Sequence, residues 1–260
     1  MTDHQAKVTS QYGQDGALAY VFENIGTTNR YYVEYGFNAK TWEGGTGSNT
    51  LQLHLAGWTG LLLDGENANP AINLAKAWIA PATIAATLAT HGVPFPSFDL
   101  LCNDIDSADL WVLRAVLSAG YRPRVVLTEF NVNYPIEATL TSSEEAPWQG
   151  PVYGASFGAF TMMMDEFGYS AVDVVGHDIL FVLRSQLRGS QLPSSYSFSA
   201  RMRKQMHGPQ RLSRERLATQ LVDYAAWRAA GGALQPSQGA AVLQQLDSLE
   251  IFTRYNGTAS

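Results

Sequence analysis

The sequence predicts an α/β fold with a mainly parallel sheet, an antiparallel closing hairpin and a helical C-terminal tail. Four short apolar runs that end in acidic residues alternate with segments of helical character. Two further runs, Tyr169–Val175 and Ile179–Leu183, are separated by only three residues. Strands that alternate with helices form parallel sheets, whereas two strands joined by a tight turn are antiparallel.

The composition indicates a folded chain with a small-molecule partner. The 260 residues are 46% hydrophobic and 15% charged, which suits one large domain, or one domain with an appendage, around a sizeable core. The formal net charge of -6 argues against a nucleic-acid partner, because there is no excess of Lys and Arg to neutralise phosphates.

The chain carries few signals of export. Cys102 is the only cysteine, so neither an intramolecular disulfide nor a cysteine-based metal cluster is available within one chain. Met1 to Ser10 is polar, and no apolar run approaches the length of a membrane span. We therefore expect a cytoplasmic protein without a membrane partner.

The first strand, Tyr31 to Phe37, is predicted to end at a pocket. A helix over Gln11 to Asn24 precedes it, and a glycine-rich turn and a short helix from Leu51 to Ala56 follow it. Glycine at the turn lets a ligand approach the backbone, and Glu34 can accept hydrogen bonds from an amine or a ribose hydroxyl. The alternative is that Glu34 is capped locally and Gly36 only makes a turn.

The second strand, Gly60 to Gly65, repeats the pattern and places Asp64 30 residues after Glu34. This spacing suits the end of the second strand of a βαβ unit. The residues that follow predict a helix over Asn69 to Ala77, a very short strand at Trp78-Ile79, and a helix over Ala80 to Gly92.

Two more strands are predicted at Phe98 to Asp106 and Arg124 to Asn131, with a helix over Ala108 to Ser118 between them. The acids at the four strand ends are Glu34, Asp64, Asp104 with Asp106, and Glu129. Parallel strands would bring these carboxylates to one edge of the sheet, which is where open α/β sheets bind ligands.

The remainder predicts a long loop over 133–154, a helix over 155–167 and then the hairpin. After Arg188 the character changes, so we predict two parts, residues 1–188 and a helical extension over 189–260. Helices are expected at 217–227 and 239–252; they would pack on the sheet, form a homo-oligomer face or contact substrate. The basic cluster within 201–216 predicts either a solvated surface or a site for an anionic acceptor.

Several motifs within roughly residues 9–185 resemble the FkbM-type methyltransferases. The matching segments are Gln11–Gly16, Tyr32–Gly36, Ser48–Thr50, Trp58–Gly65, Asp99–Asp106, Pro123–Asn131, Tyr153–Ser156 and Gly168-Tyr169. The resemblance departs from the family at three points. Asn38-Ala39 stands where an Asp-Gly pair is common, Asp64 replaces a Glu, and Asn103 replaces a small or apolar residue.

The resemblance implies a Rossmann-like enzyme that moves a methyl group from S-adenosylmethionine to an oxygen of a small molecule, a sugar or a natural product. Its implied cofactor-binding residues are Gln14, Glu34, Gly36, Asn49, Asp64 and Asp104. Glu34 and Gly36 would face the methionine end of the cofactor. Asp64 would accept the ribose hydroxyls, and Asp104 would lie near the sulfonium and the acceptor.

Methyl transfer to oxygen requires a base or a metal ion to take up the hydroxyl proton. Asp104, Asp106 and Glu129 are the candidate catalytic residues. Asp104, Glu129 and Asn131 are the candidate ligands of a magnesium ion, which prefers oxygen donors. The alternative is that these acids only cap a helix or bind Arg124. His177, in the hairpin turn, is expected to be an exposed residue.

Two rival functions remain open. A nicotinamide oxidoreductase would use the same fold, but the residues after Gly36 lack the G-x-G-x-x-G fingerprint. A non-catalytic binding or assembly module is favoured by the altered turn after Gly36 and disfavoured by the acids at four strand ends.

Overall fold

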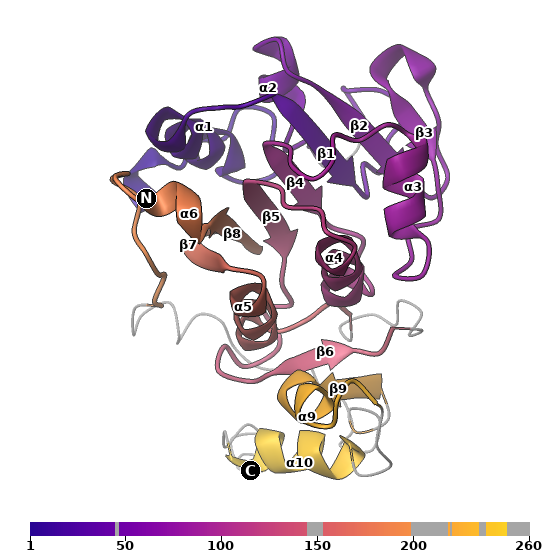
Figure 1. Ribbon diagram of the computed structural model, residues 1–260, viewed down its shortest axis with the longest axis vertical. Helices are drawn as coiled ribbons and strands as arrows, with labels where there is room; N and C mark the ends of the chain where they lie inside the picture. The colour runs from indigo at the N-terminus through magenta and orange to yellow at the C-terminus, as the bar shows by residue number, and fades with distance from the viewer. Residues whose placement is uncertain (45–46, 145–152, 199–217, 219, 234–237, 249–260) are drawn as a thin grey trace, which may run out of the picture. The chain divides into compact units, whose positions relative to one another are not determined.

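The computed structural model describes residues 1–44, 47–144, 153–198, 218, 220–233 and 238–248. Its main element is a seven-stranded sheet in the order β3-β2-β1-β4-β5-β8-β7 (Figure 1). The strands are β1 Tyr31–Tyr35, β2 Thr59–Asp64, β3 Leu74–Lys76, β4 Leu100–Asn103, β5 Val125–Glu129, β7 Tyr169–Val175 and β8 Asp178–Leu183.

Helices alternate with most of the strands along the chain, as the pattern predicts. They are η1 Thr2–His4, α1 Gln14–Ile25, α2 Leu51–Leu55, η2 Pro70–Ile72, α3 Ile84–Thr90, α4 Asp109–Ser118, α5 Phe157–Glu166, α6 Arg184–Leu187, α9 Tyr224–Ala229 and α10 Gln238–Ser248. None of the described helices is long and apolar enough to cross a membrane.

The predicted fold class is confirmed by the strand directions. β3, β2, β1, β4 and β5 run parallel to one another, whereas β8 runs antiparallel to β5 and to β7. The chain builds outward from β1 in one direction with β2 and β3, and in the other with β4 and β5. The fold is therefore a Rossmann-like α/β sheet whose order reverses between β1 and β4.

The central strands are buried on both faces, which explains why they appear in the sequence as continuous apolar runs. Val33 and Leu61 to Leu63 are fully buried. α1 packs through Leu18 and Val21 into a core cluster that includes Tyr32 and Cys102. Because alternate residues of a strand point to the same face, Glu34 projects to this same side of the sheet.

A buried ion pair connects the starts of β4 and β5 to the end of α1. Arg124 Nη1 lies 2.7 Å from Asp99 Oδ1, and the same guanidinium donates to the carbonyls of Ile25 and Gly26. Asp99 also accepts hydrogen bonds from the backbone of Thr28 and its neighbours. Burial alone would raise the pKa of Asp99, but these hydrogen bonds outweigh it and lower the pKa.

Four predicted elements are wrong in detail. The predicted helix over Asn69 to Ala77 is only the single turn η2, Pro70–Ile72. The third strand is Leu74–Lys76, not Trp78-Ile79, because a left-handed Asn73 (φ 54°) ends a single helical turn and lets the chain pair with β2. The long loop contains a strand, β6 Leu140–Ser142. In the tail, β9 Leu221–Asp223 replaces part of the predicted helix, because Asp223 caps the start of α9.

The chain divides into two compact units. The first comprises Met1–Ile105, Trp111–Glu129 and Met164–Tyr196 and holds the seven-stranded sheet. The second comprises Asp106–Leu110, Phe130–Met163 and Ser197–Ser260. The predicted boundary at residue 188 stays a prediction, and the basic cluster within 201–216 lies outside the described residues.

The second unit is built around a two-stranded antiparallel sheet of β6 and β9. Gln245 of α10 ties the two strands together. Its side chain accepts a hydrogen bond from the Thr139 backbone and donates to the carboxylate of Asp223. Segments far apart in the sequence therefore share one small sheet.

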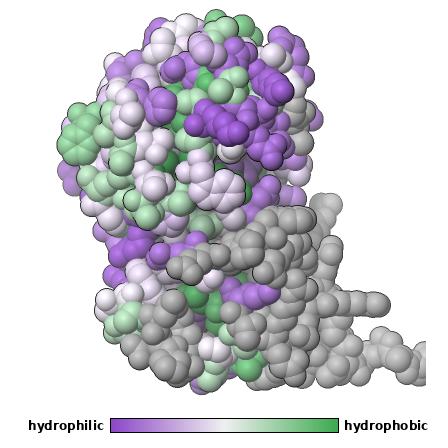
Figure 2. Space-filling view, turned by 90° about the vertical axis from the view of Figure 1, so that its right-hand side faces the viewer, coloured by the Kyte–Doolittle hydropathy of each residue, from purple (hydrophilic) through white to green (hydrophobic). Residues whose placement is uncertain are grey.

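Hydrophobic residues on the surface are scattered among hydrophilic ones. On the face shown in Figure 2, the hydrophobic residues of the described part of the chain form small groups that hydrophilic residues separate. The most exposed large apolar side chain among the described residues is Trp78, at 82%.

Candidate active site

The carboxyl ends of β1, β2, β4 and β5 meet at one edge of the sheet, as the parallel register requires. Glu34 is the fourth residue of β1, Asp64 ends β2, and Glu129 ends β5. Asp104 follows β4 directly. Asp64, Asp104 and Glu129 are thus on one rim, beside the point where the strand order reverses. Glu34 lies deeper in the sheet, level with Leu62 and Cys102.

Glu34 holds the loop that leads into α2. Its carboxylate accepts hydrogen bonds from Ser48 Oγ and the Asn49 backbone N–H, both at 2.9 Å, and from the Thr50 hydroxyl. Burial raises the pKa of Glu34, and these hydrogen bonds oppose the rise. The local cap considered in the sequence analysis is present, and the cofactor roles of Glu34 and Asn49 remain predictions.

Gly36 is required by the packing of one turn on another. Its φ of +67° is the left-handed region, and a Cβ at this position would overlap the carbonyl oxygen of Asp104. The turn after β1 therefore touches the backbone after β4. This contact fixes the position of Asp104 relative to the first strand.

Asp64 organises the turn after β2. Its Oδ1 accepts from the backbone N–H groups of Glu66 (2.7 Å) and Asn67 (2.6 Å), and its Oδ2 accepts from Asn38 N–H at 2.9 Å. A carboxylate oxygen has two lone pairs, so Oδ2 keeps capacity for one more donor. The exposed ring of Trp78 stands beside this turn, 3.7 Å from where a Cβ of Gly65 would lie.

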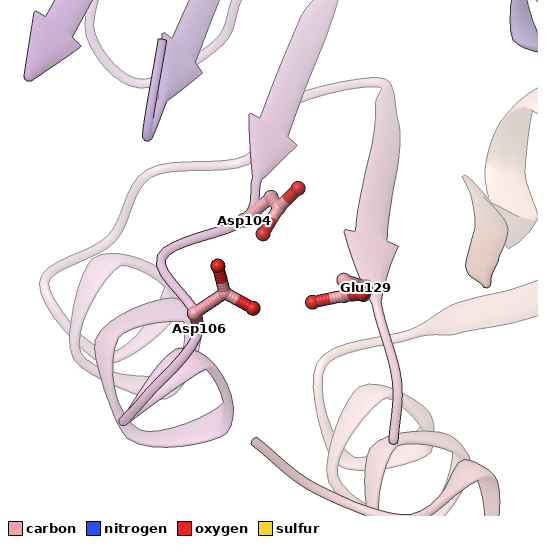
Figure 3. A group of neighbouring side chains, drawn as sticks. All are labelled: Asp104, Asp106 and Glu129. Atoms are coloured by element: carbon pink, nitrogen blue, oxygen red, sulfur yellow. The ribbon is translucent and has the colours of Figure 1, made fainter. Parts of the chain in front are cut away.

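Asp104, Asp106 and Glu129 form a cluster of three carboxylates at the ends of β4 and β5. One carboxylate oxygen from each lies within 4.8 Å of the others. Figure 3 shows Asp104 and Asp106 on the same turn after β4, facing Glu129 across the gap between the strand ends. Negative charges this close repel one another, and a divalent cation would remove the repulsion.

Asn131, the third predicted metal ligand, is engaged elsewhere. Its Oδ1 accepts hydrogen bonds from the backbone and side-chain nitrogens of Asn133, each at 2.9 Å, and its Nδ2 donates to the Tyr153 carbonyl at 3.0 Å. The amide therefore orders its own segment. Asp106 is the residue that joins Asp104 and Glu129.

Asp178 is a buried acid at this rim that the sequence analysis did not select. It begins β8, where its register partner is Glu129, and it accepts a 2.6 Å hydrogen bond from Gln14 Nε2. The hairpin pattern contains the signal, because an antiparallel neighbour places its first residue beside the last residue of β5.

The turn before Asp178 carries His177 over the same rim. Its Nδ1 lies 3.9 Å from Glu129 Oε1, and its ring centroid lies 5.4 Å from that of Tyr12. The side chain of His177 is 44% exposed, so the histidine is half-buried rather than exposed as predicted. Burial lowers the pKa of His177.

The environment of Asp178 predicts a pH-dependent stability. Burial, with a smaller contribution from Glu34, raises the pKa of Asp178 to about 6, and the Gln14 hydrogen bond opposes the rise. The folded state therefore binds this proton more tightly than the unfolded state. Its contribution to stability is complete below the unfolded pKa, near 4, and is lost as the pH rises through about 6.

Asp178→Asn should remove this loss. We expect the variant to gain about 1 kcal/mol or more relative to the parent between pH 4 and pH 7, measured by urea unfolding across that range. Asp165→Asn, at an exposed acid, is the control and should follow the parent. A constant difference between Asp178→Asn and the parent across this range would contradict the expectation.

The similarity of the chain to known proteins is weak. No protein-family model matches the chain, and no curated protein sequence matches it. A solved structure of the MycE methyltransferase from the mycinamycin biosynthetic pathway, in complex with Mg and SAH, is similar with a TM-score of 0.40 and 13% identity. The match covers 64% of this chain and 47% of that chain. This chain therefore spans about half the length of that protein.

Proposed function

We propose that the chain is an S-adenosylmethionine-dependent methyltransferase of FkbM type that methylates a hydroxyl oxygen of a small molecule, sugar or natural product. The observation that carries the proposal is the rim itself. Asp64, Asp104, Asp106 and Glu129 stand at the carboxyl ends of parallel strands beside the reversal of strand order, where open α/β sheets bind ligands.

The residues at the rim fit the cofactor at two points. Asp64 Oδ2 has capacity for a ribose hydroxyl, and the exposed Trp78 ring beside the same turn offers an aromatic surface for a base. The cofactor, when bound, supplies an electrophilic methyl group on a sulfonium. Gln14 and Glu34 contribute by holding Asp178 and the loop at 48–50, so that the rim keeps its shape.

The three-carboxylate cluster fits a magnesium ion, with Asp104, Asp106 and Glu129 as the ligands. Magnesium prefers hard oxygen donors such as carboxylates. One carboxylate oxygen from each of the three residues lies within 4.8 Å of the others. The ion, when bound, lowers the pKa of a coordinated hydroxyl. Without it, Asp106 is the best placed general base, because its side chain is the exposed member of the cluster.

Binding of the cofactor tests the proposal. We expect S-adenosylmethionine and S-adenosylhomocysteine to raise the melting temperature while NAD does not. In Asp64→Asn the loss of one acceptor oxygen should weaken cofactor binding about tenfold or more, measured by calorimetry. Asp165→Asn is the matched control on an exposed acid and should bind as the parent does.

The same titration with magnesium tests the cluster. Asp106 has a left-handed φ of 55°, which asparagine tolerates, so Asp106→Asn removes a charge without straining the turn. We expect this variant to lose most of the stabilisation by magnesium. Stabilisation by NAD alone would support an oxidoreductase. Stabilisation by none of these ligands would support the non-catalytic module, which is consistent with Glu34 being capped within its own loop.

A further inference from the structure

A cavity of about 600 Å³ lies in the first unit, beside the loop that Glu34 holds. It is bounded by Thr9, by the segment that includes Trp42 and Glu43, and by Leu51, His54 and Leu55 around α2. This volume is typical of pockets for small molecules. Neither Asp64 nor any member of the three-carboxylate cluster lines it.

The walls of this cavity are held in place by two buried carboxylates. Asp15 accepts hydrogen bonds from the backbone of Val8, Thr9 and Ser10, which fixes the wall at Thr9. Glu34 holds residues 48–50, from which α2 begins. The Ser48 backbone N–H donates to the Thr9 carbonyl at 3.2 Å and joins the two walls. These contacts therefore hold two of the cavity's walls, at Thr9 and at the start of α2.

Aromatic and aliphatic side chains supply its binding surface. The Trp42 ring packs edge-on against the Phe37 ring, with 5.3 Å between their centroids, and stacks on the His54 ring, with 5.0 Å between their centroids. These two contacts orient the Trp42 ring. Leu51 and Leu55 lie four residues apart and form one apolar strip of α2. Leu55 is 69% exposed, so its apolar side chain is accessible to a ligand.

The charge of the cavity selects the ligand. Among the described lining residues, Glu43 is the only carboxylate, and no Lys or Arg lines the cavity. A cavity lined by both a carboxylate and an indole ring can recognise organic cations, because the ring face attracts positive charge while the carboxylate neutralises it. We propose that this cavity binds a small apolar molecule that carries an amine or a quaternary ammonium group.

The probe for this site is choline, compared with dimethylbutanol, in which a carbon replaces the charged nitrogen. We expect choline to bind at least about fivefold more tightly at low salt, and to shift the indole resonance of Trp42 in nuclear magnetic resonance spectra. Trp42→Phe assigns that resonance. Equal affinity for the two probes would overturn the proposal.

Two variants keep the test specific. Glu43→Gln should reduce the affinity for choline about fivefold and leave dimethylbutanol binding unchanged, because it removes only the charge. Glu23→Gln, on an exposed acid of α1, should bind both probes as the parent does. Unchanged choline binding in Glu43→Gln would also overturn the proposal. These measurements use no methyl donor, so their outcome is independent of the proposed methyltransferase activity.

Discussion

Asp99→Ala is expected to lower the free energy of unfolding by about 3–5 kcal/mol. The substitution leaves the guanidinium of Arg124 buried without its carboxylate, and it also removes the acceptor of the backbone N–H groups of Thr28 and Arg30. An uncompensated buried charge destabilises the folded state, and the loss of the hydrogen bonds to these partly buried N–H groups adds to the cost. Urea unfolding at neutral pH measures the change.

A second ion pair of the same residue types provides the matched control. Arg184 and Asp165 are 2.6 Å apart, but their side chains are 46% and 75% exposed. Water already solvates both groups, so Asp165→Ala should cost at most about 1 kcal/mol. Similar losses in the two variants would show that the Asp99 pair is not the buried link described here.

The second large effect is expected from Gly36→Ala. The added methyl group has to displace the carbonyl oxygen of Asp104, and the left-handed φ adds backbone strain. We expect destabilisation of about 2–5 kcal/mol from the two costs together. If magnesium binds the parent, its affinity should fall as well, because Asp104 moves away from Glu129.

Gly92→Ala separates the two costs. Gly92 has nearly the same φ, +69°, but no atom lies within 4 Å of the position of its Cβ. Its substitution measures the backbone strain alone, which is about 1–2 kcal/mol. The excess for Gly36→Ala over Gly92→Ala then measures the contact with Asp104, and an excess of zero would contradict it.

The sheet and most of its elements could be predicted because their signal is local. Fully buried strands read as apolar runs, and the hairpin of β7 and β8 follows from the short turn between its strands. β3 and β9 could not be predicted, because three-residue strands carry no periodicity. Both exist because a partner strand pairs with them.

The candidate site, like the fold, could be predicted from the sequence only in part. Acids at the ends of parallel strands could be located from sequence, since strand direction alone brings them to one edge. The hydrogen-bond and cluster partners of each acid could not be located from the sequence. That Glu34 accepts from Ser48, and that Asp106 rather than Asn131 joins Asp104, depends on how turns pack after the chain has folded.

The pairing of β6 with β9 limits how the chain can be shortened. Leu140–Ser142 has its antiparallel partner about eighty residues later, in Leu221–Asp223. A truncated protein that stops before β9 would leave β6 with a row of bare backbone donors and acceptors along that side. A strand with an unpaired edge can form hydrogen bonds with a strand of another molecule. Shortened versions should therefore aggregate even though the seven-stranded sheet is complete.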